Sequence, residues 1–313
     1  MEQSSIIRDG LLASAAFLAL VLLALFIPFA ALLLVFFLPL PLVRFTYNYG
    51  WLPGSILGLS IFFLLFLILG PFAPAIMLLF GISGIVIGEL FRRNEKAFGV
   101  YAGAALSIIG GLVLTYVGFM AFTDTDPIVQ LQSTLEDSLG TTEDILGTNA
   151  EEDTEAIEQM MNFIDNISVI VPAILVFTGA AAAFLTQLAA ARWLRSRGEK
   201  IVKFPPLRKW SLPKSFIWYY LFALILSFIN AAEGETGVIN TLSSNLMPVL
   251  GSLMILQGIS FLFFYFHLKK LSIILPIMIT FSLVVFPFML PIIRILGIID
   301  LGFDLRTRLK SQK

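Results

Sequence analysis

Residues 97–122, AFGVYAGAALSIIGGLVLTYVGFMAF, decide the fold class, because this stretch contains no charged residue. A bilayer core about 30 Å thick is crossed by roughly 20 apolar residues in helical conformation. We therefore interpret the stretch as a transmembrane helix.

Apolar runs of similar length lie on both sides of this helix. The expected crossings are 10–27, 29–43, 51–69, 72–91, 97–122, 167–190, 215–232 and 246–267. The last run, 271–303, contains three prolines, and we predict that it turns near Pro287 and returns as a short, partly interfacial helix. The total is about ten membrane segments, with eight as the alternative.

The composition agrees with this interpretation. Hydrophobic residues make up 58% of the chain and charged residues 13%, whereas soluble domains carry roughly 25% charged residues. We predict an all-α, polytopic integral membrane bundle in the lipid bilayer. The chain has no cysteine, which excludes disulfides, thiol catalysis and Cys-ligated metals.

Charge divides the chain into three regions. Membrane helices in 1–123 and 167–313 flank an acidic segment, 124–166, which contains no Lys or Arg. We expect short helices near 128–135 and 157–164 in this segment, which is either a solvated loop or a lid over an outward-facing site.

The basic residues indicate the orientation in the membrane. They fall at Arg8, Arg44, Arg92, Arg93, Lys96, 192–214, Lys269, Lys270 and 306–313. Alternating crossings place all of them on one face, which the positive-inside rule assigns to the cytoplasm of a plasma-membrane protein, together with both termini. Tryptophans within 192–214 favour contact with anionic lipid headgroups, with a protein-binding surface as the alternative and no nucleic acid expected.

Motifs of catalysis are missing from the sequence. There is no phosphate-binding G-x-x-x-x-G-K-[ST], no H-E-x-x-H and no G-x-S-x-G. His267 is the single histidine, so a multi-histidine metal site is impossible. We expect no enzymatic activity, no cofactor and no metal.

Ionisable residues within apolar runs mark candidate sites. Glu89 has Arg92 and Arg93 at i+3 and i+4, which predicts a local ion pair. Arg294 and Asp300 are solvated if the last helix lies at the interface, and they need partners if it is inserted.

Uncharged polar residues suggest a binding site. We name Tyr116, Asn230 and Gln257 as candidate substrate-binding residues, which, with Thr115, are expected to converge on one cavity beneath the acidic segment. Hydrogen bonding between helices is the alternative explanation. Ala15 and Ala19 share one face of the first helix, which suggests either close packing or docking of a membrane partner.

Several short motifs resemble the YybS-like family of bacterial membrane proteins, whose function is unknown. They are FLPLP at 37–41, GWLPG at 50–54, FPP at 204–206, WSLP at 210–213 and LGIID at 296–300. The first half is more distantly similar to the substrate-binding membrane subunits of energy-coupling-factor transporters. In those subunits an Ala-x-x-x-Ala face on the first helix docks the coupling subunit, and Ala15 and Ala19 match it here.

The functional expectation is a subunit that binds or transports a vitamin-like or metabolite-like small molecule. Without a nucleotide-binding motif, active uptake would need a partner ATPase or an ion gradient. The alternative is a non-enzymatic membrane scaffold of the cell envelope.

Overall fold

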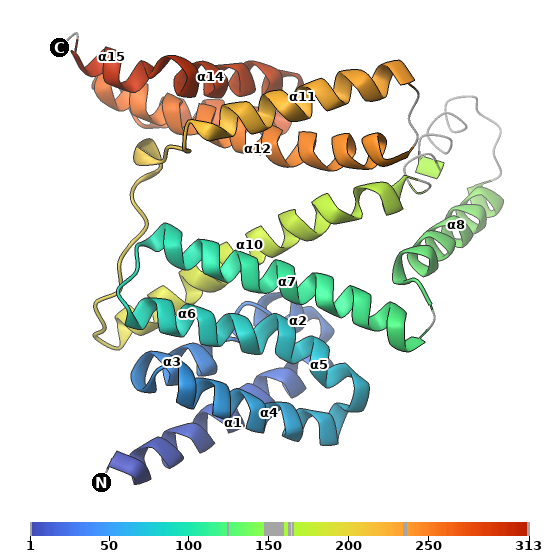
Figure 1. Ribbon diagram of the computed structural model, residues 1–313, viewed down its shortest axis with the longest axis vertical. Helices are drawn as coiled ribbons and strands as arrows, with labels where there is room; N and C mark the ends of the chain where they lie inside the picture. The colour runs from blue at the N-terminus through green and yellow to red at the C-terminus, as the bar shows by residue number, and fades with distance from the viewer. Residues whose placement is uncertain are drawn as a thin grey trace. The chain divides into compact units, whose positions relative to one another are not determined.

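The computed structural model describes residues 2–123, 125–146, 160–161, 164, 166–233 and 237–311, which form helices and no strand (Figure 1). Six helices in this part of the chain are long and apolar enough to cross a membrane, or up to seven if one bent pair is counted as a span. This number is lower than the eight to ten membrane segments that we expected. The predicted class, a polytopic helical membrane bundle, is confirmed. The chain divides into two compact units, which are described separately: unit 1 (Met1–Ile157 and Leu175–Phe204) and unit 2 (Glu158–Ile174 and Pro205–Lys313).

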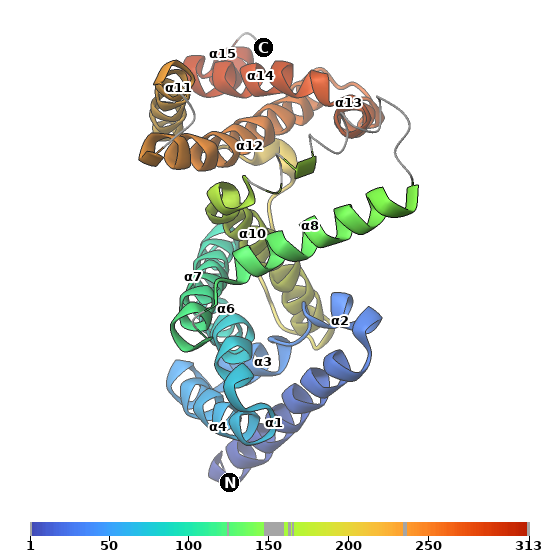
Figure 2. The same ribbon diagram turned by 90° about the vertical axis from the view of Figure 1, so that its right-hand side faces the viewer.

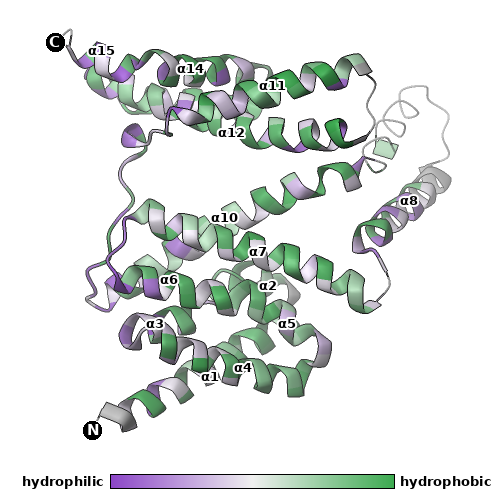
Figure 3. Ribbon diagram, viewed as in Figure 1, coloured by the Kyte–Doolittle hydropathy of each residue, from purple (hydrophilic) through white to green (hydrophobic). Residues whose placement is uncertain are grey.

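Long apolar helices build unit 1. They are α1 (Glu2–Phe26), α4 (Trp51–Leu69), α7 (Ala97–Thr123) and most of α10 (Ile167–Ser196). Hydrophobic residues predominate along α4 and α7 (Figure 3). The acidic α8 (Pro127–Leu146) contains the helix expected near 128–135, whereas the one expected near 157–164 lies mostly outside the described residues.

The run from 51 to 92 folds back on itself after α4. Gly70, at φ +56°, opens a 3₁₀ turn (Gly70–Phe72) that leads into α5 (Ala73–Ile76), a π-helical turn (Met77–Gly81) and α6 (Ile82–Arg92). A Cβ atom built on Gly58 would lie 3.0 Å from Cδ1 of Ile85, so α4 and α6 are in contact. The two helices predicted in this run are confirmed.

The predicted crossing 29–43 is not a single helix. It is divided into α2 (Pro28–Leu34) and α3 (Leu40–Tyr49), with turns between them. Pro39 and Pro41 lack the N–H groups that a continuous helix would need, so the chain turns there and α3 continues beyond residue 43. Pro28 also begins a new helix, as its fixed φ favours.

Small residues let α6 approach α3 closely. A Cβ on Gly84 would lie 2.8 Å from the carbonyl oxygen of Pro39, and one on Gly88 would lie 2.6 Å from that of Val43. The Gly-x-x-x-Gly spacing therefore packs helices inside unit 1.

Unit 2 is built from α11 (Ser215–Glu233), α12 (Gly237–Leu268), α13 (Ile274–Val285), a 3₁₀ turn (Pro287–Met289), α14 (Leu290–Phe303) and α15 (Leu305–Ser311). The chain bends by 116° between α13 and α14, which confirms the turn predicted near Pro287. α12 and α14 run side by side (Figure 2). The backbones of α12 and α14 approach each other closely at Gly297, because a Cβ atom built there would lie 2.0 Å from the carbonyl oxygen of Met254.

Candidate ligand-binding sites

A groove of about 800 Å³ opens beside α1 in unit 1. Most of its length is apolar: Leu12, Ala13, Ala16, Ala19, Leu20, Leu23, Leu34, Phe37 and Leu40. Polar side chains gather at one end: Asp9, Arg44, Asn48, Tyr49 and Arg197, with Trp193 among them. The volume lies within the 300–1,000 Å³ that small-molecule sites occupy.

The Asp9 carboxylate at the polar end of the groove already has a hydrogen-bond partner and an ion-pair partner. The Tyr49 hydroxyl donates to Asp9 at 2.8 Å, and the Arg8 guanidinium lies 3.4 Å from the same carboxylate. The hydrogen bond to Asp9, with burial as a second cause, raises the pKa of the Tyr49 phenol above its ordinary value. The first turns of α1 and the last turn of α3 are thereby joined.

Among the described residues, neither of the two arginines at this end is paired with a carboxylate within 4.0 Å, although Asp9 lies near enough to Arg44 for an electrostatic interaction. Arg44 and Arg197 lie 5.6 and 5.7 Å from the centre of the Trp193 ring, at cation–π distance. The polar end therefore keeps positive charge available for a ligand.

Other basic residues of unit 1 lie near this same end. Arg93 binds Glu89 at 2.7 Å, which confirms the predicted local pair, and the Arg92 guanidinium lies against Gly50 at the end of α3. The Tyr47 hydroxyl donates to Glu199 at 2.9 Å and so ties α3 to the segment after α10.

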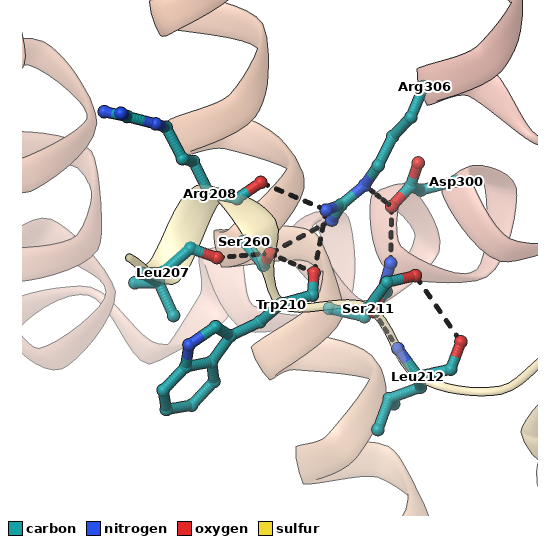
Figure 4. Close-up of polar contacts among 9 residues, drawn as sticks. Leu207, Arg208, Trp210, Ser211, Leu212, Ser260, Asp300 and Arg306 are labelled. Atoms are coloured by element: carbon teal, nitrogen blue, oxygen red, sulfur yellow. Dashed lines mark hydrogen bonds and ion pairs between the residues drawn. The ribbon is translucent and has the colours of Figure 1, made fainter. Parts of the chain in front are cut away.

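In unit 2 a buried ion pair joins the end of α14 to α15. Arg306 Nε donates to Asp300 Oδ2 at 2.9 Å, and Asp300 is only 3% exposed (Figure 4). Gln257 Nε2 donates to the same oxygen from α12. Asp300 is therefore buried and paired, and the interpretation of this residue as solvated at an interface is wrong.

The same cluster holds part of the basic segment in place. Arg306 donates to the carbonyl oxygens of Arg208 and Trp210 at 3.2 and 2.7 Å, and Ser260 Oγ lies 3.0 Å from Arg306 Nη2. The Leu212 N–H donates to Gln257 Oε1 at 2.9 Å. The extended chain before α11 is thus fixed to α12 and α15 through hydrogen bonds to its backbone.

The three predicted substrate-binding residues have separate surroundings. Tyr116, in unit 1, donates to Asp126 at 3.2 Å. Asn230, in unit 2, donates to Asn240 at 3.2 Å, and residue 240 lies 17 positions before Gln257 on α12, which is about 25 Å of helix. Gln257 is buried in the ion-pair cluster, so Asn230 and Gln257 do not share the predicted cavity.

Asn230 does line a different pocket, of about 400 Å³, together with Arg294. Gln187 is buried and donates to the carbonyl of Ala97 at 2.9 Å, as a helix-to-helix hydrogen bond. Ala15 and Ala19 are both exposed on α1 in unit 1, and Ala19 borders the groove. Docking of a partner at these alanines stays a prediction.

The groove could be found only in part from the sequence. Trp193 and Arg197 belong to the basic segment 192–214, which the sequence marks as a contact surface. Asp9 and Tyr49 belong to no sequence pattern that indicates a site. Among the residues that the structure describes, no group of three His, Cys, Asp or Glu could hold a metal ion.

Apolar helices with charged ends define a multi-pass membrane protein. The chain belongs to the family described as "Predicted membrane protein (DUF2232)", whose model matches residues 15–301. It is similar to the uncharacterized protein YybS of Bacillus subtilis (strain 168), with 27% identity over 99% of this chain and 100% of the relative. No solved structure matches, and the likeness to energy-coupling-factor subunits stays a prediction.

Proposed function

We propose that this protein is a non-enzymatic membrane subunit that binds an amphiphilic small molecule in the groove of unit 1. The ligand class is an apolar body with an anionic end. One observation carries the proposal: an apolar groove ends beside Arg44 and Arg197, which form no ion pair within 4.0 Å among the described residues.

The chemistry of the groove selects for such a ligand. Its aliphatic walls on α1 and α2 favour a hydrocarbon, since burial contributes about 25 cal/mol per Å² of apolar surface. Its basic end favours a carboxylate or phosphate, because hydrogen bonds to charged groups are about twice as strong as neutral ones. A neutral hydrocarbon would form no ion pair with either guanidinium group.

Transport, if the bound molecule is moved across the membrane, needs a partner. The sequence carries no phosphate-binding loop, so a coupling subunit or an ion gradient would supply the energy. The exposed Ala15–Ala19 face of α1 is the surface that we assign to such a coupling subunit.

The basic ends of both units are proposed to face the cytoplasm, together with both chain termini, in the plasma membrane. Because the natural chain has no cysteine, a single introduced cysteine is the one reactive thiol. An impermeant maleimide should label Glu136→Cys in α8 on whole cells and Lys310→Cys only after lysis. Labelling of both positions on whole cells would reject this orientation.

The binding test uses the full chain, purified in a neutral detergent. Short-chain phosphatidylglycerol and a saturated fatty acid should raise the melting temperature, and phosphatidylcholine of the same chain length should not. At a concentration 100 times the dissociation constant, binding adds about 2.7 kcal/mol of stability, or roughly 5 °C. The double variant Arg44→Gln/Arg197→Gln should lose this response.

A matched control is Arg192→Gln, which removes an exposed arginine on α10 outside the groove lining. It should respond as the natural protein does. Equal responses to anionic and neutral amphiphiles, or an unchanged response in the double variant, would contradict the proposal.

A second candidate function, a non-enzymatic scaffold of the cell envelope, is favoured by the exposure of Ala15 and Ala19. Crosslinking in cells distinguishes the two. Recovery of a coupling subunit and an ATPase supports the transport subunit, whereas recovery of cell-wall or division proteins, lost in Ala15→Leu/Ala19→Leu, supports the scaffold.

A further inference from the structure

Along the chain, Arg294 lies apart from the basic clusters of unit 2. In the described part of this unit, the remaining Lys and Arg residues precede α11, follow α12 or follow the end of α14: Arg208, Lys209, Lys214, Lys269, Lys270, Arg306, Arg308 and Lys310. Arg294 instead lies in the first two turns of α14, beside the last turn of α11. It is therefore near the ends of α11 and α14 that lie away from the basic cluster, and beside the middle of α12.

Among the side chains that the structure describes, no ion pair within 4.0 Å involves Arg294. Its Nε is buried without a hydrogen-bond partner. The two carboxylates that follow on the same segment are occupied, because Asp300 is bound to Arg306 and Asp304 to Lys214. A buried guanidinium nitrogen without a hydrogen-bond partner is costly, so we expect this side chain to serve a partner or a ligand in the adjoining cavity.

The fold makes room for this side chain. A Cβ built on Gly251 of α12 would lie 3.3 Å from Cζ and 3.4 Å from Nε of Arg294, so the guanidinium rests on the bare backbone of that glycine. A Cβ atom at position 251 would make the guanidinium shift by a few tenths of an ångström, and a branched side chain would occupy its place. The placement is therefore defined by packing, and the side chain is not simply extended into solvent.

Polar groups surround the guanidinium. Arg294 lines the pocket of about 400 Å³ with Ser227 and Asn230 of α11 and with Ser243, Ser244 and Pro248 of α12. The Asn230 amide donates one N–H to Asn240, while its Oδ1 has no partner. The Ser243 and Ser244 hydroxyls donate to Asn240, and Oδ1 of Asn230 is an acceptor. The donors left for a carboxylate or phosphate are therefore the Arg294 guanidinium, the Ser227 hydroxyl and the second N–H of the Asn230 amide.

We infer that this pocket binds a small oxyanion, a carboxylate or a phosphate group, with Arg294 as its principal ligand. The planar guanidinium can donate two parallel hydrogen bonds to two oxygens of the same group. The site is separate from the groove of unit 1, and it uses none of the groove's residues. The oxyanion belongs either to a free solute or to a lipid headgroup, and both present the same chemistry to the pocket.

The experiment measures thermal stability of the full chain in neutral detergent at constant ionic strength. The probes are inorganic phosphate, succinate and short-chain phosphatidylglycerol, each compared with the same ionic strength of chloride. The variants are Arg294→Gln and, as a control, Arg308→Gln, which removes an exposed arginine of α15. Because phosphatidylglycerol is also a probe for the groove, all variants are made in the Arg44→Gln/Arg197→Gln background.

At least one probe should raise the melting temperature above the chloride reference in the background protein and in Arg308→Gln. In Arg294→Gln its apparent affinity should fall about ten-fold or more. A response to phosphate or succinate assigns a free solute, and a response to phosphatidylglycerol alone assigns a lipid headgroup. No response above chloride for any probe, or equal responses with and without Arg294, would overturn the site.

A second variant keeps the arginine and therefore covers the case in which Arg294→Gln fails to fold. Gly251→Val occupies the place of the guanidinium and should weaken oxyanion binding as Arg294→Gln does. Unchanged oxyanion affinity in Gly251→Val would also overturn the proposal.

Discussion

The basic ends of the two units differ in how their arginines are neutralised. In unit 2, Arg306 is bound by Asp300 and by two backbone carbonyls, so its donors are used within the protein. In unit 1, Arg44 and Arg197 contact the face of Trp193 and form no ion pair within 4.0 Å among the described residues. The comparison separates a structural arginine from arginines that are available to a ligand.

This difference predicts opposite effects of substitution. Removing a partner from the internally satisfied cluster should lower stability, because an uncompensated charge stays buried. Removing the available arginines should have a small effect on stability and should weaken binding about ten-fold or more. The following predictions run from large expected changes in stability to small ones.

Asp300→Ala should lower the free energy of unfolding by about 3–5 kcal/mol, since Arg306 would remain buried without its carboxylate. The control Lys214→Gln breaks the pair with Asp304, whose side chains are 68% and 50% exposed, and should cost less than about 1 kcal/mol. Thermal unfolding of both variants in one detergent measures the difference. Equal losses would mean that the buried pair is no more important than the exposed one.

Gly297→Ala should be destabilising by about 1–3 kcal/mol, because its Cβ would lie 2.0 Å from the carbonyl oxygen of Met254 and would separate α14 from α12. The matched control is Gly302→Ala on the same helix, where the nearest atom would lie at 3.7 Å. That change should be neutral or slightly stabilising. A Gly297→Ala variant that melts with the natural protein would contradict the close approach of these two helices.

Tyr47→Phe should cost about 1 kcal/mol or less, the contribution of one hydrogen bond to Glu199. Burial, and then the bond to Glu199, raises the pKa of the Tyr47 phenol above 10.0. The stabilising effect of Tyr47 is thus fully present below pH 10 and is lost as the pH rises through the raised pKa. Chemical unfolding from pH 8 to pH 11 should show a steeper loss of stability in the natural protein than in Tyr47→Phe.

Arg44→Gln/Arg197→Gln should have a small effect on stability, because each of the two cation–π contacts at this accessible site contributes only about 0.5–1 kcal/mol. Titration with short-chain phosphatidylglycerol should nevertheless show a loss of affinity of about ten-fold or more. If the double variant were strongly destabilised, Arg44 and Arg197 would have a structural role like that of Arg306, and the distinction between the two units would be wrong.

Hydropathy predicted the membrane helices well. The run 97–122 became a single helix, and prolines located the turn near Pro287, because both features depend only on local sequence. The same reasoning failed for 29–43. There, the total apolar length concealed the break that Pro39 and Pro41 impose between α2 and α3.

The sites were harder to predict because they depend on tertiary contacts. Glu89 and Arg93 are one helical turn apart, so their ion pair could be recognised. Asp300 and Arg306 are six residues apart across a break at Asp304, whose φ is +50°, and helical spacing does not reveal their contact. Arg44 and Arg197 come from distant parts of the chain, and only folding brings both to Trp193.

Photo-crosslinking locates the ligand most directly. The full chain in nanodiscs is irradiated with a trace of diazirine-labelled phosphatidylglycerol or with the equally labelled phosphatidylcholine, and the modified peptides are identified by mass spectrometry. The account predicts labelling on α1 and α2 around Leu20, Leu23 and Leu34 by the anionic lipid alone, and its loss in Arg44→Gln/Arg197→Gln. Labelling of these peptides by both lipids alike, or its persistence in the double variant, would contradict anionic recognition by the groove.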